Sequence, residues 1–253
     1  MKKSLLAAIA VAALFFSSCA KHGIIPSGNT IDYCRITSIS GGGFGDTLSF
    51  YYNPDGTPSH VERLIVSDGS PKYLFRYDRQ GRLLDYVAAF DNGAAESWTR
   101  FYYDEPSRTV VDTEYTLAAQ YVTWPPAFFG DEVVERKGYD ELGRIISYDH
   151  FFVLKKADGS DTAEFLTSQT YTYDRAGNVT GLPHDNKVNL HRTNRVWQFI
   201  DNDYNNNNTL PVQRYNSDGL PGVMSGSNST PFLFDLEFPT LTIHYSCDAP
   251  LRK

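Results

Sequence analysis

The first residues to weigh for chemistry are two histidines and an aspartate late in the chain. His184 and His191 are the closest pair of histidines, and Asp185 lies beside the first of them. Zinc sites use recurring, shorter ligand spacings, and a separation of seven residues matches none of them. We expect these side chains to serve the fold, and no metal ligand is assigned here.

A calcium loop is the second chemistry that the sequence suggests. Asp201, Asp203 and Asn205 occupy the first three oxygen-ligand positions of an EF-hand loop. The match then fails, because Asn206 stands where the loop requires glycine and Val212 where it requires a bidentate glutamate. We predict a polar loop stabilised by Asx turns, so the sequence implies neither a metal nor a cofactor.

Catalytic motifs are missing from the sequence. The glycine-rich stretch 41–45 lacks the Gly-Lys-Ser or Gly-Lys-Thr ending of a P-loop, and neither the Gly-x-Ser-x-Gly elbow nor the His-Glu-x-x-His helix occurs. Paired carboxylates for glycoside hydrolysis stay open, since 30 acidic residues are present and a sequence does not give their separation. Trp98, Trp124 and Trp197 could stack on sugar rings, although such rings more often fill a β core.

The N-terminus indicates export. Two lysines precede an apolar run from Leu5 to Phe16, which would rise about 18 Å as a helix, well short of a hydrocarbon core of about 30 Å. This pattern is typical of a signal peptide. Cys19 follows Ser17 and Ser18, an arrangement that resembles a bacterial lipobox and predicts removal of residues 1–18, lipid attachment at Cys19 and a tether over 19–29. An ordinary signal peptide cut near the same place is the alternative.

The two remaining cysteines are a candidate disulfide. Cys34 lies near the start of the folded region and Cys247 near its end. Export exposes them to oxidising conditions, and pairing would bring the first and last strands together. The alternative is two separate buried thiols.

One short element recurs six times along the folded region. Each copy has tyrosine, then aspartate or asparagine, then two variable residues, then usually glycine. The copies are Tyr52 to Gly56, Tyr77 to Gly81, Tyr103 to Ser107, Tyr139 to Gly143, Tyr173 to Gly177 and Tyr215 to Gly219. Recurrence on this scale predicts one supersecondary unit for each copy.

The chemistry of one copy predicts a β-hairpin. Aspartate or asparagine can hydrogen-bond to the backbone two residues on, and the glycine supplies the positive φ that ends a type I turn with a bulge. Residues on both sides of the second copy alternate with period two. With Tyr77 opposite Arg82, this pattern predicts that Phe75 faces Leu84 and that Tyr73 faces Tyr86.

Charges exclude two classes of partner or setting. With 23 basic and 30 acidic residues the formal charge is −7, which argues against electrostatic binding of nucleic acid phosphates. Arg76, Asp85, Arg136 and Asp149 would interrupt the outward rows of the predicted strands. A strand facing lipid needs an uninterrupted apolar row, so we expect a water-soluble sheet that does not insert into the outer membrane.

These copies resemble the YD repeat of bacterial Rhs-type shells, whose signature is Tyr-Asp-x-x-Gly-Arg followed by an aliphatic residue. The copies beginning at Tyr77 and Tyr139 match it fully, and the others are degraded. Together with the lipobox and the Asn-rich segment 185–208, the chain looks like a family of Bacteroidetes lipoproteins of unknown function with a porin-like, all-antiparallel β fold. The resemblance implies an architecture and carries no catalytic residues.

The sequence therefore predicts an all-β protein with one antiparallel meander of repeated hairpins over residues 30–253, forming a strongly curved or barrel-like, porin-like sheet. It would be a lipid-anchored protein of the outer membrane. The periplasmic side is favoured over the cell surface, because Ala20, Lys21 and His22 after the lipidated cysteine contain no acidic surface-export signal. We expect a non-enzymatic binding or scaffolding shell whose partner is a glycan or an envelope protein. The alternative is a carbohydrate-active hydrolase that uses paired carboxylates.

Overall fold

The computed structural model describes residues 30–31, 33–41, 46–66, 71–118, 132–155, 160–209, 211–225 and 240–248. The expected signal peptide (1–18), the tether (19–29) with Cys19, and Trp124 lie outside the described residues. Within the described part of the chain, no helix is long and apolar enough to cross a membrane.

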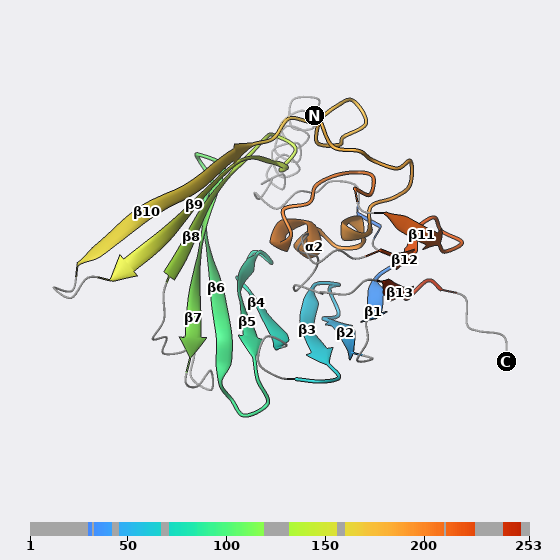
Figure 1. Ribbon diagram of the computed structural model, residues 1–253, viewed down its shortest axis with the longest axis horizontal. Coiled ribbons are helices and arrows are strands. Elements are labelled where there is room, and N and C mark those ends of the chain that lie inside the picture. The colour runs from blue at the N-terminus through green and yellow to red at the C-terminus, as the bar shows by residue number, and fades with distance from the viewer. Residues whose placement is uncertain are drawn as a thin grey trace, which may run out of the picture.

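The described strands form one antiparallel sheet of 13 strands. They are β1 (Ile36–Gly41), β2 (Asp46–Tyr52), β3 (Pro58–Arg63), β4 (Lys72–Tyr77), β5 (Leu83–Ala89), β6 (Ala95–Asp104), β7 (Thr109–Ala118), β8 (Glu132–Tyr139), β9 (Ile145–Lys155), β10 (Asp161–Thr170), β11 (Val212–Tyr215), β12 (Pro221–Met224) and β13 (Leu241–Tyr245). Strands β1 to β10 follow one another in space as they do in sequence (Figure 1). The prediction of an all-β antiparallel meander is confirmed.

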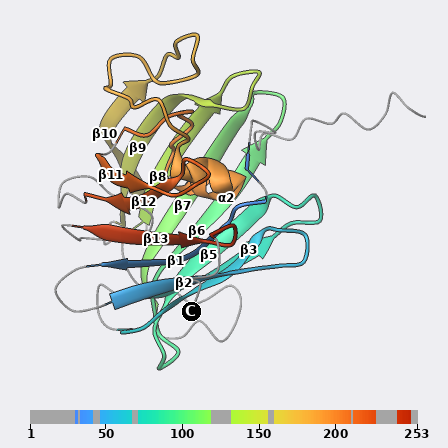
Figure 2. The ribbon, with the colours of Figure 1, turned by 90° about the vertical axis from the view of Figure 1, so that its right-hand side faces the viewer.

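The sheet is open, which corrects the expected strongly curved or barrel-like shell. Closing it would require the last strands to pair with β10. Instead β13 pairs with β1, and the order continues through β12 to β11 (Figure 2). The sheet therefore ends at β10 on one side and at β11 on the other, and it is neither closed nor strongly curled.

The repeated turns share one backbone geometry. In the second copy the amide of Asp78 donates to the carbonyl of Arg82, and the amide of Gly81 donates to the carbonyl of Asp78. The same pair of bonds recurs in the copies that end in glycine, and each of these glycines has a positive φ, between 72° and 90°: Gly56, Gly81, Gly143, Gly177 and Gly219. The third copy lacks the glycine, and its turn closes one residue later at Arg108, with φ 52°.

A bulge shifts the register that we expected for the second hairpin. Tyr77 lies opposite Leu83 and Phe75 opposite Tyr86, with an irregularity between Arg76 and Tyr77. The predicted pairs of Phe75 with Leu84 and of Tyr73 with Tyr86 are therefore wrong. The aromatic face survives, because the Phe75 and Tyr86 rings still lie 6.0 Å apart.

In four of the six copies, the hydroxyl of the leading tyrosine bonds to the first residue of an earlier strand. The Tyr77 hydroxyl donates to the carbonyl of Pro58, the first residue of β3, at 2.7 Å. The Tyr103 hydroxyl donates in the same way to Leu83, the first residue of β5, also at 2.7 Å. Equivalent bonds run from Tyr52 to Ile36 and from Tyr173 to Ile145, and Tyr245 of β13, which opens no copy, bonds in the same way to Pro221. This bond explains why tyrosine, rather than phenylalanine, leads four of the six turns. The Tyr139 hydroxyl does not make it in the described structure, and the Tyr215 hydroxyl donates to Asp185 instead.

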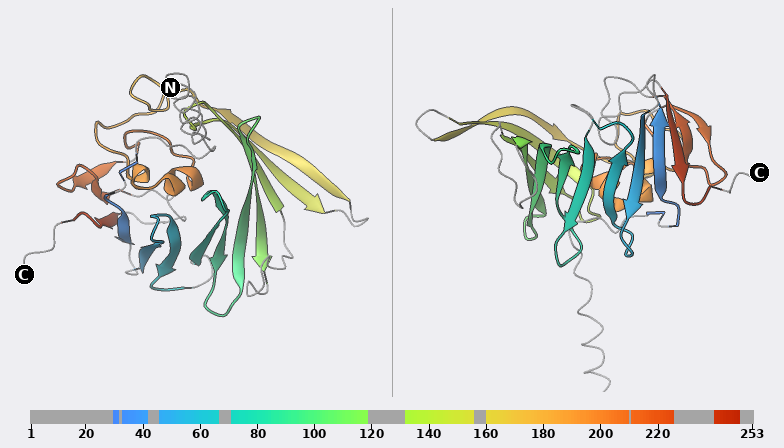
Figure 3. Two further views of the ribbon diagram at one scale, coloured as in Figure 1. Left: turned by 180° about the vertical axis from the view of Figure 1, so that it is seen from behind. Right: turned by 90° about the horizontal axis from the view of Figure 1, so that it is seen from below.

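A helical insert between β10 and β11 covers one face of the sheet, which we call the inner face. It contains the 3₁₀ turn η1 (Leu190–Thr193) and helix α2 (Arg195–Ile200), seen beside the sheet in Figure 3. Trp197 packs edge-on against Phe50 and Phe75, at 5.4 and 5.8 Å between ring centroids, and Phe199 packs against Phe101 at 4.8 Å. These rings belong to the main hydrophobic core.

The insert is also held by the repeated turns. The Asn194 side chain accepts from the Val196 amide at the start of α2 and donates to the carbonyl of Gly56 at 2.9 Å. The Arg195 side chain donates to the carbonyl of Gly81. The turns therefore close the hairpins and position the helix that fills the inner face.

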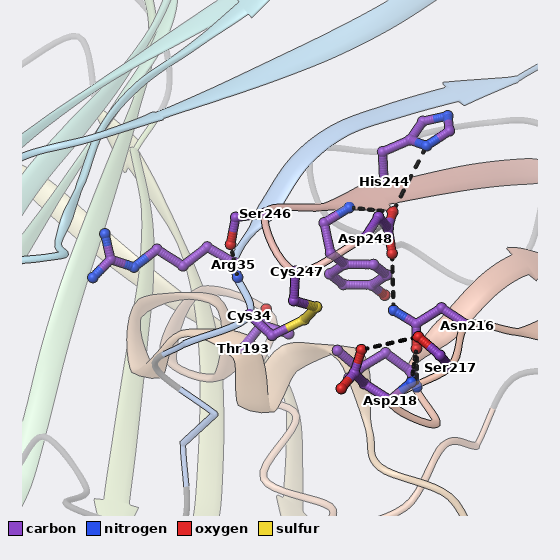
Figure 4. Close-up of a disulfide and its surroundings, with 12 residues drawn as sticks. Cys34, Arg35, Thr193, Asn216, Ser217, Asp218, His244, Ser246, Cys247 and Asp248 are labelled. Atoms are coloured by element: carbon purple, nitrogen blue, oxygen red, sulfur yellow. Dashed lines mark hydrogen bonds and ion pairs between the residues drawn. A yellow bond between two sulfur atoms is a disulfide. The ribbon is translucent and has the colours of Figure 1, made fainter. Parts of the chain in front are cut away.

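A disulfide links the beginning and the end of the chain segment that forms the sheet. Cys34 precedes β1 and Cys247 follows β13, and the structure links them with Cα atoms 4.9 Å apart (Figure 4). Beside the disulfide, the amide of Arg35 donates to the hydroxyl of Ser246. The bond joins residues 213 positions apart and locks the pairing of β1 with β13.

Candidate functional site

His191, one of the two histidines considered in the sequence, pairs with side chains inside the protein. His191 is buried, with Nε2 2.6 Å from Asp201 and Nδ1 3.0 Å from Asp203. Burial alone would lower the pKa of His191, but the hydrogen bonds and charges of the two aspartates outweigh it and raise the pKa to about 10. The protonated ring of His191 therefore pairs with Asp201 and Asp203, the two aspartates that match calcium-ligand positions in the sequence.

The other polar residues of this segment also bond within it. Asp203 accepts from the side chain of Asn189 and from Asn205, and Asp185 accepts from Asn208. The His184 ring lies 3.1 Å from the side-chain oxygen of Asn205. Nowhere among the described residues do three or more histidine, cysteine or acidic side chains gather as they would around a metal ion.

The described tryptophans are not arranged to stack on a sugar. Trp197 is fully buried between α2, to which it belongs, and the inner face of the sheet, and Trp98 is 6% exposed on the opposite, outer face. Trp98 stacks on Tyr115 there, and the Arg100 guanidinium lies 5.6 Å from its ring centre. Both rings complete hydrophobic clusters, as the structural alternative predicted.

The most unusual group of polar side chains was not predicted from the sequence. Lys137 on β8 donates to Asp112 on β7 at 2.6 Å and lies 2.8 Å from Glu135, two residues before it on β8. Lys137 is 2% exposed and Asp112 is 3% exposed. One ammonium thus holds two carboxyl groups side by side in the inner face of the sheet.

Two side chains of β9 extend this cluster. The Tyr148 hydroxyl donates to Glu135 at 2.6 Å, and Nδ1 of His150 lies 3.3 Å from that hydroxyl. The strand registers explain the grouping, because Glu135 lies opposite Asp112 on one side and opposite His150 on the other. We call Asp112, Glu135, Lys137, Tyr148 and His150 the acid–lysine cluster.

The pKa values of the Asp112 and Glu135 carboxyl groups shift in opposite directions. Burial raises the pKa of Asp112 to about 7, although the Lys137 charge opposes this. Burial acts in the same sense on Glu135, but there Lys137 and the Tyr148 hydrogen bond dominate and lower the pKa. The pKa of Lys137 is raised, since the two carboxylates outweigh its burial. Among the described residues, Oδ1 of Asp112 is buried without a hydrogen-bond partner.

Around the cluster the inner face becomes more accessible toward the β10 edge. Tyr148, His150 and Phe152 alternate along β9 on this face and are half-buried. Tyr171, just after β10, donates to Gln169. We call Tyr148, His150, Phe152 and Tyr171, with Glu135, the inner-face patch.

The cluster left a weak signal in the sequence, since Glu135 and Lys137 alternate on one strand. The pairing of β7 with β8 depends on a connection outside the described residues, so nothing in the sequence pointed from Asp112 to Lys137.

Comparisons with protein-family models and with curated proteins find no match to the chain. Its function has to be argued from this geometry.

Proposed function

We propose that the protein is a lipid-anchored component of the cell envelope whose β-sheet is a non-enzymatic binding or scaffolding platform. The lipobox-like Cys19 supports the anchor, and the absence of an acidic residue from Ala20, Lys21 and His22 favours the periplasmic side of the outer membrane. The shared geometry of the repeated turns supports the likeness to YD repeats.

The observation that carries the proposal is how the inner face is occupied. The insert fills the face over the central strands with Trp197 and Phe199, and its polar side chains bond among themselves. The inner-face patch lies beside an open edge of the sheet and presents half-buried aromatic and polar groups. Such an arrangement favours recognition by a preformed surface.

A glycan is the ligand class that suits this patch. Rings of Tyr148, Phe152 and Tyr171 offer faces for the apolar side of a sugar, while the partly exposed carboxylate of Glu135 offers hydrogen bonds to its hydroxyl groups. An envelope protein with hydroxyl-rich or amide side chains is the other partner of the same chemistry.

Glycoside hydrolysis is the second candidate, and one observation favours it. Asp112 and Glu135 share one ammonium, which holds their carboxyl groups close together, as the neighbouring carboxyl groups of retaining glycosidases are, and their pKa values are pushed apart. Against it, Asp112 is almost completely buried behind Lys137 and cannot reach a glycosidic oxygen. Binding therefore accounts for the geometry better.

Glycan-array binding of the detergent-extracted full-length protein tests the proposal. We expect binding to a defined glycan class, lost by about tenfold or more in Tyr171→Ala because a stacking face is removed. Tyr51→Ala is the matched control, since Tyr51 is 46% exposed but lies on β2, away from the patch. Binding that the two variants weaken equally would contradict the patch, and release of sugar from a bound glycan would support the hydrolase instead.

A further inference from the structure

The side-chain nitrogen of Lys137, a potential nucleophile, lies beside the carboxyl group of Asp112. Nζ of Lys137 lies 2.6 Å from Oδ2 of Asp112. A nitrogen this close to a carboxyl oxygen lies within about 3 to 4 Å of the carboxyl carbon, near the reacting distance of about 3–3.5 Å in near-attack geometries. Both side chains project from neighbouring strands that the sheet holds in fixed register.

The surroundings are unlike those of an ordinary surface ion pair. Asp112 lies opposite Phe101 of β6, and Lys137 lies opposite Val110 of β7 and Tyr148 of β9. Phe101 and Val110 belong to the buried core. Charges held in such surroundings carry a large desolvation penalty, which a neutral product would remove. The exposed pair of Lys72 and Asp91, 3.0 Å apart, lacks this driving force.

Glu135 completes the set of groups that amide formation needs. Its carboxylate lies 2.8 Å from the same Nζ and is fixed by the Tyr148 hydroxyl. A carboxylate at hydrogen-bond distance from the attacking nitrogen can accept a proton from it and return that proton to a leaving oxygen.

We propose that Lys137 and Asp112 are joined by an intramolecular isopeptide bond, with Glu135 carrying the proton. A proton first passes from the Lys137 ammonium to Asp112, giving a neutral amine and a neutral carboxylic acid. Burial of both groups favours this neutral pair, while the attraction of the two carboxylates, which raises the pKa of Lys137, opposes it. The amine nitrogen then forms a bond to Cγ of Asp112, and Glu135 takes a proton from that nitrogen. The Cγ–OH bond breaks, Glu135 returns the proton to the leaving hydroxyl, and one water departs. The step needs no oxidant, reductant or cofactor.

The isopeptide bond would cross-link two neighbouring strands in the middle of the sheet. The bond would close a loop between residues 25 positions apart and fix β7 to β8, through which β9 and β10 join the rest of the sheet. A cross-link of this kind stabilises a fold by constraining its unfolded state. It would differ from the Cys34–Cys247 disulfide in surviving reduction.

Peptide mapping of the reduced, alkylated full-length protein by tandem mass spectrometry tests the proposal. We expect a branched peptide that contains both Lys137 and Asp112 and weighs about 18 Da less than the sum of its parts, the mass of one water. The peptides with Lys72 and Asp91 should be recovered unlinked. Recovery of the Lys137 and Asp112 peptides in unlinked form from folded wild-type protein would overturn the proposal.

The conservative variant Glu135→Gln tests the proton carrier separately. It keeps the shape of the side chain and its contact with Tyr148, so we expect folded protein with at least a tenfold smaller linked fraction. A linked fraction equal to that of the wild type would overturn the role of Glu135. Lys137→Arg, which cannot form the amide, should give only unlinked peptides, and a linked Asp112 peptide in that variant would show that another amine is used.

Discussion

At the scale of single residues, many polar side chains bond to other groups of the same fold. His191 is the clearest case, because both of its ring nitrogens bond to carboxylates of the insert. The tyrosine hydroxyls do the same for the hairpins. The patterns that suggested zinc or calcium are therefore internal hydrogen-bond networks.

The paired His191 makes stability depend on pH. Its pKa is raised from 6.5 to about 10 in the folded protein, so its stabilisation is complete below about pH 6.5 and is lost as the pH rises toward 10. We expect the free energy of unfolding from urea titrations to fall by about 2 kcal/mol between pH 7 and 9 through this group. His191→Gln should remove that part of the slope, and His184→Gln should keep it. An equal slope in His191→Gln would contradict the assignment.

The leading tyrosines give a second prediction. Tyr77→Phe removes the hydrogen bond to the carbonyl of Pro58 and leaves that carbonyl buried, which should cost about 1 kcal/mol. Thermal unfolding should show a lower Tm for this variant. Tyr51→Phe changes an exposed hydroxyl and should leave the Tm unaltered; a matching loss there would mean that the effect is not specific to the turn.

The proposed lipid anchor depends on one residue. Cys19→Ala removes the thiol that we propose is acylated, so the protein should leave the membrane fraction and should take up no labelled fatty acid. Continued labelling of Cys19→Ala would refute the anchor at this position.

At the scale of elements, the bulged turns set the geometry of the hairpins. Gly81 has φ +75°, and a methyl group added to its Cα would meet only the Arg195 side chain, 3.9 Å away, so Gly81→Ala tests backbone conformation alone. Forcing a side chain into this region should cost about 1–2 kcal/mol by urea unfolding. Gly222→Ala is the control, because Gly222 lies in β12 and its nearest contact, the carbonyl oxygen of Arg214, would be 3.5 Å away. Equal stability of the two variants would count against the turn assignment.

The turns were predictable from the sequence because their requirements are local. Tyrosine, aspartate and glycine at fixed offsets specify the corner, and five glycines have the required φ. The register was not predictable in detail, since a bulge beside Tyr77 moves Leu83 into the core. The turn at Gly93 was missed because Phe90 stands where the repeat has aspartate or asparagine.

At the scale of the whole molecule, the order of the last three strands decides the architecture. The local pattern predicts hairpins, and it says nothing of which edge β13 joins. The Cys34–Cys247 disulfide and the pairing of β13 with β1 place the closing strands at the first edge. The acid–lysine cluster was missed for a similar reason, because Asp112 and Lys137 meet only through the pairing of β7 with β8.

The open sheet leaves β10 as an edge strand that is exposed along most of its length. Hydrogen exchange of dilute full-length protein, resolved to single amides, tests this architecture most directly. We predict fast exchange at alternate amides of β10 and β11, which face no neighbouring strand, and slow exchange throughout β6, which pairs on both sides. Uniformly slow exchange along both β10 and β11 would show that the edges pair and would contradict the open sheet.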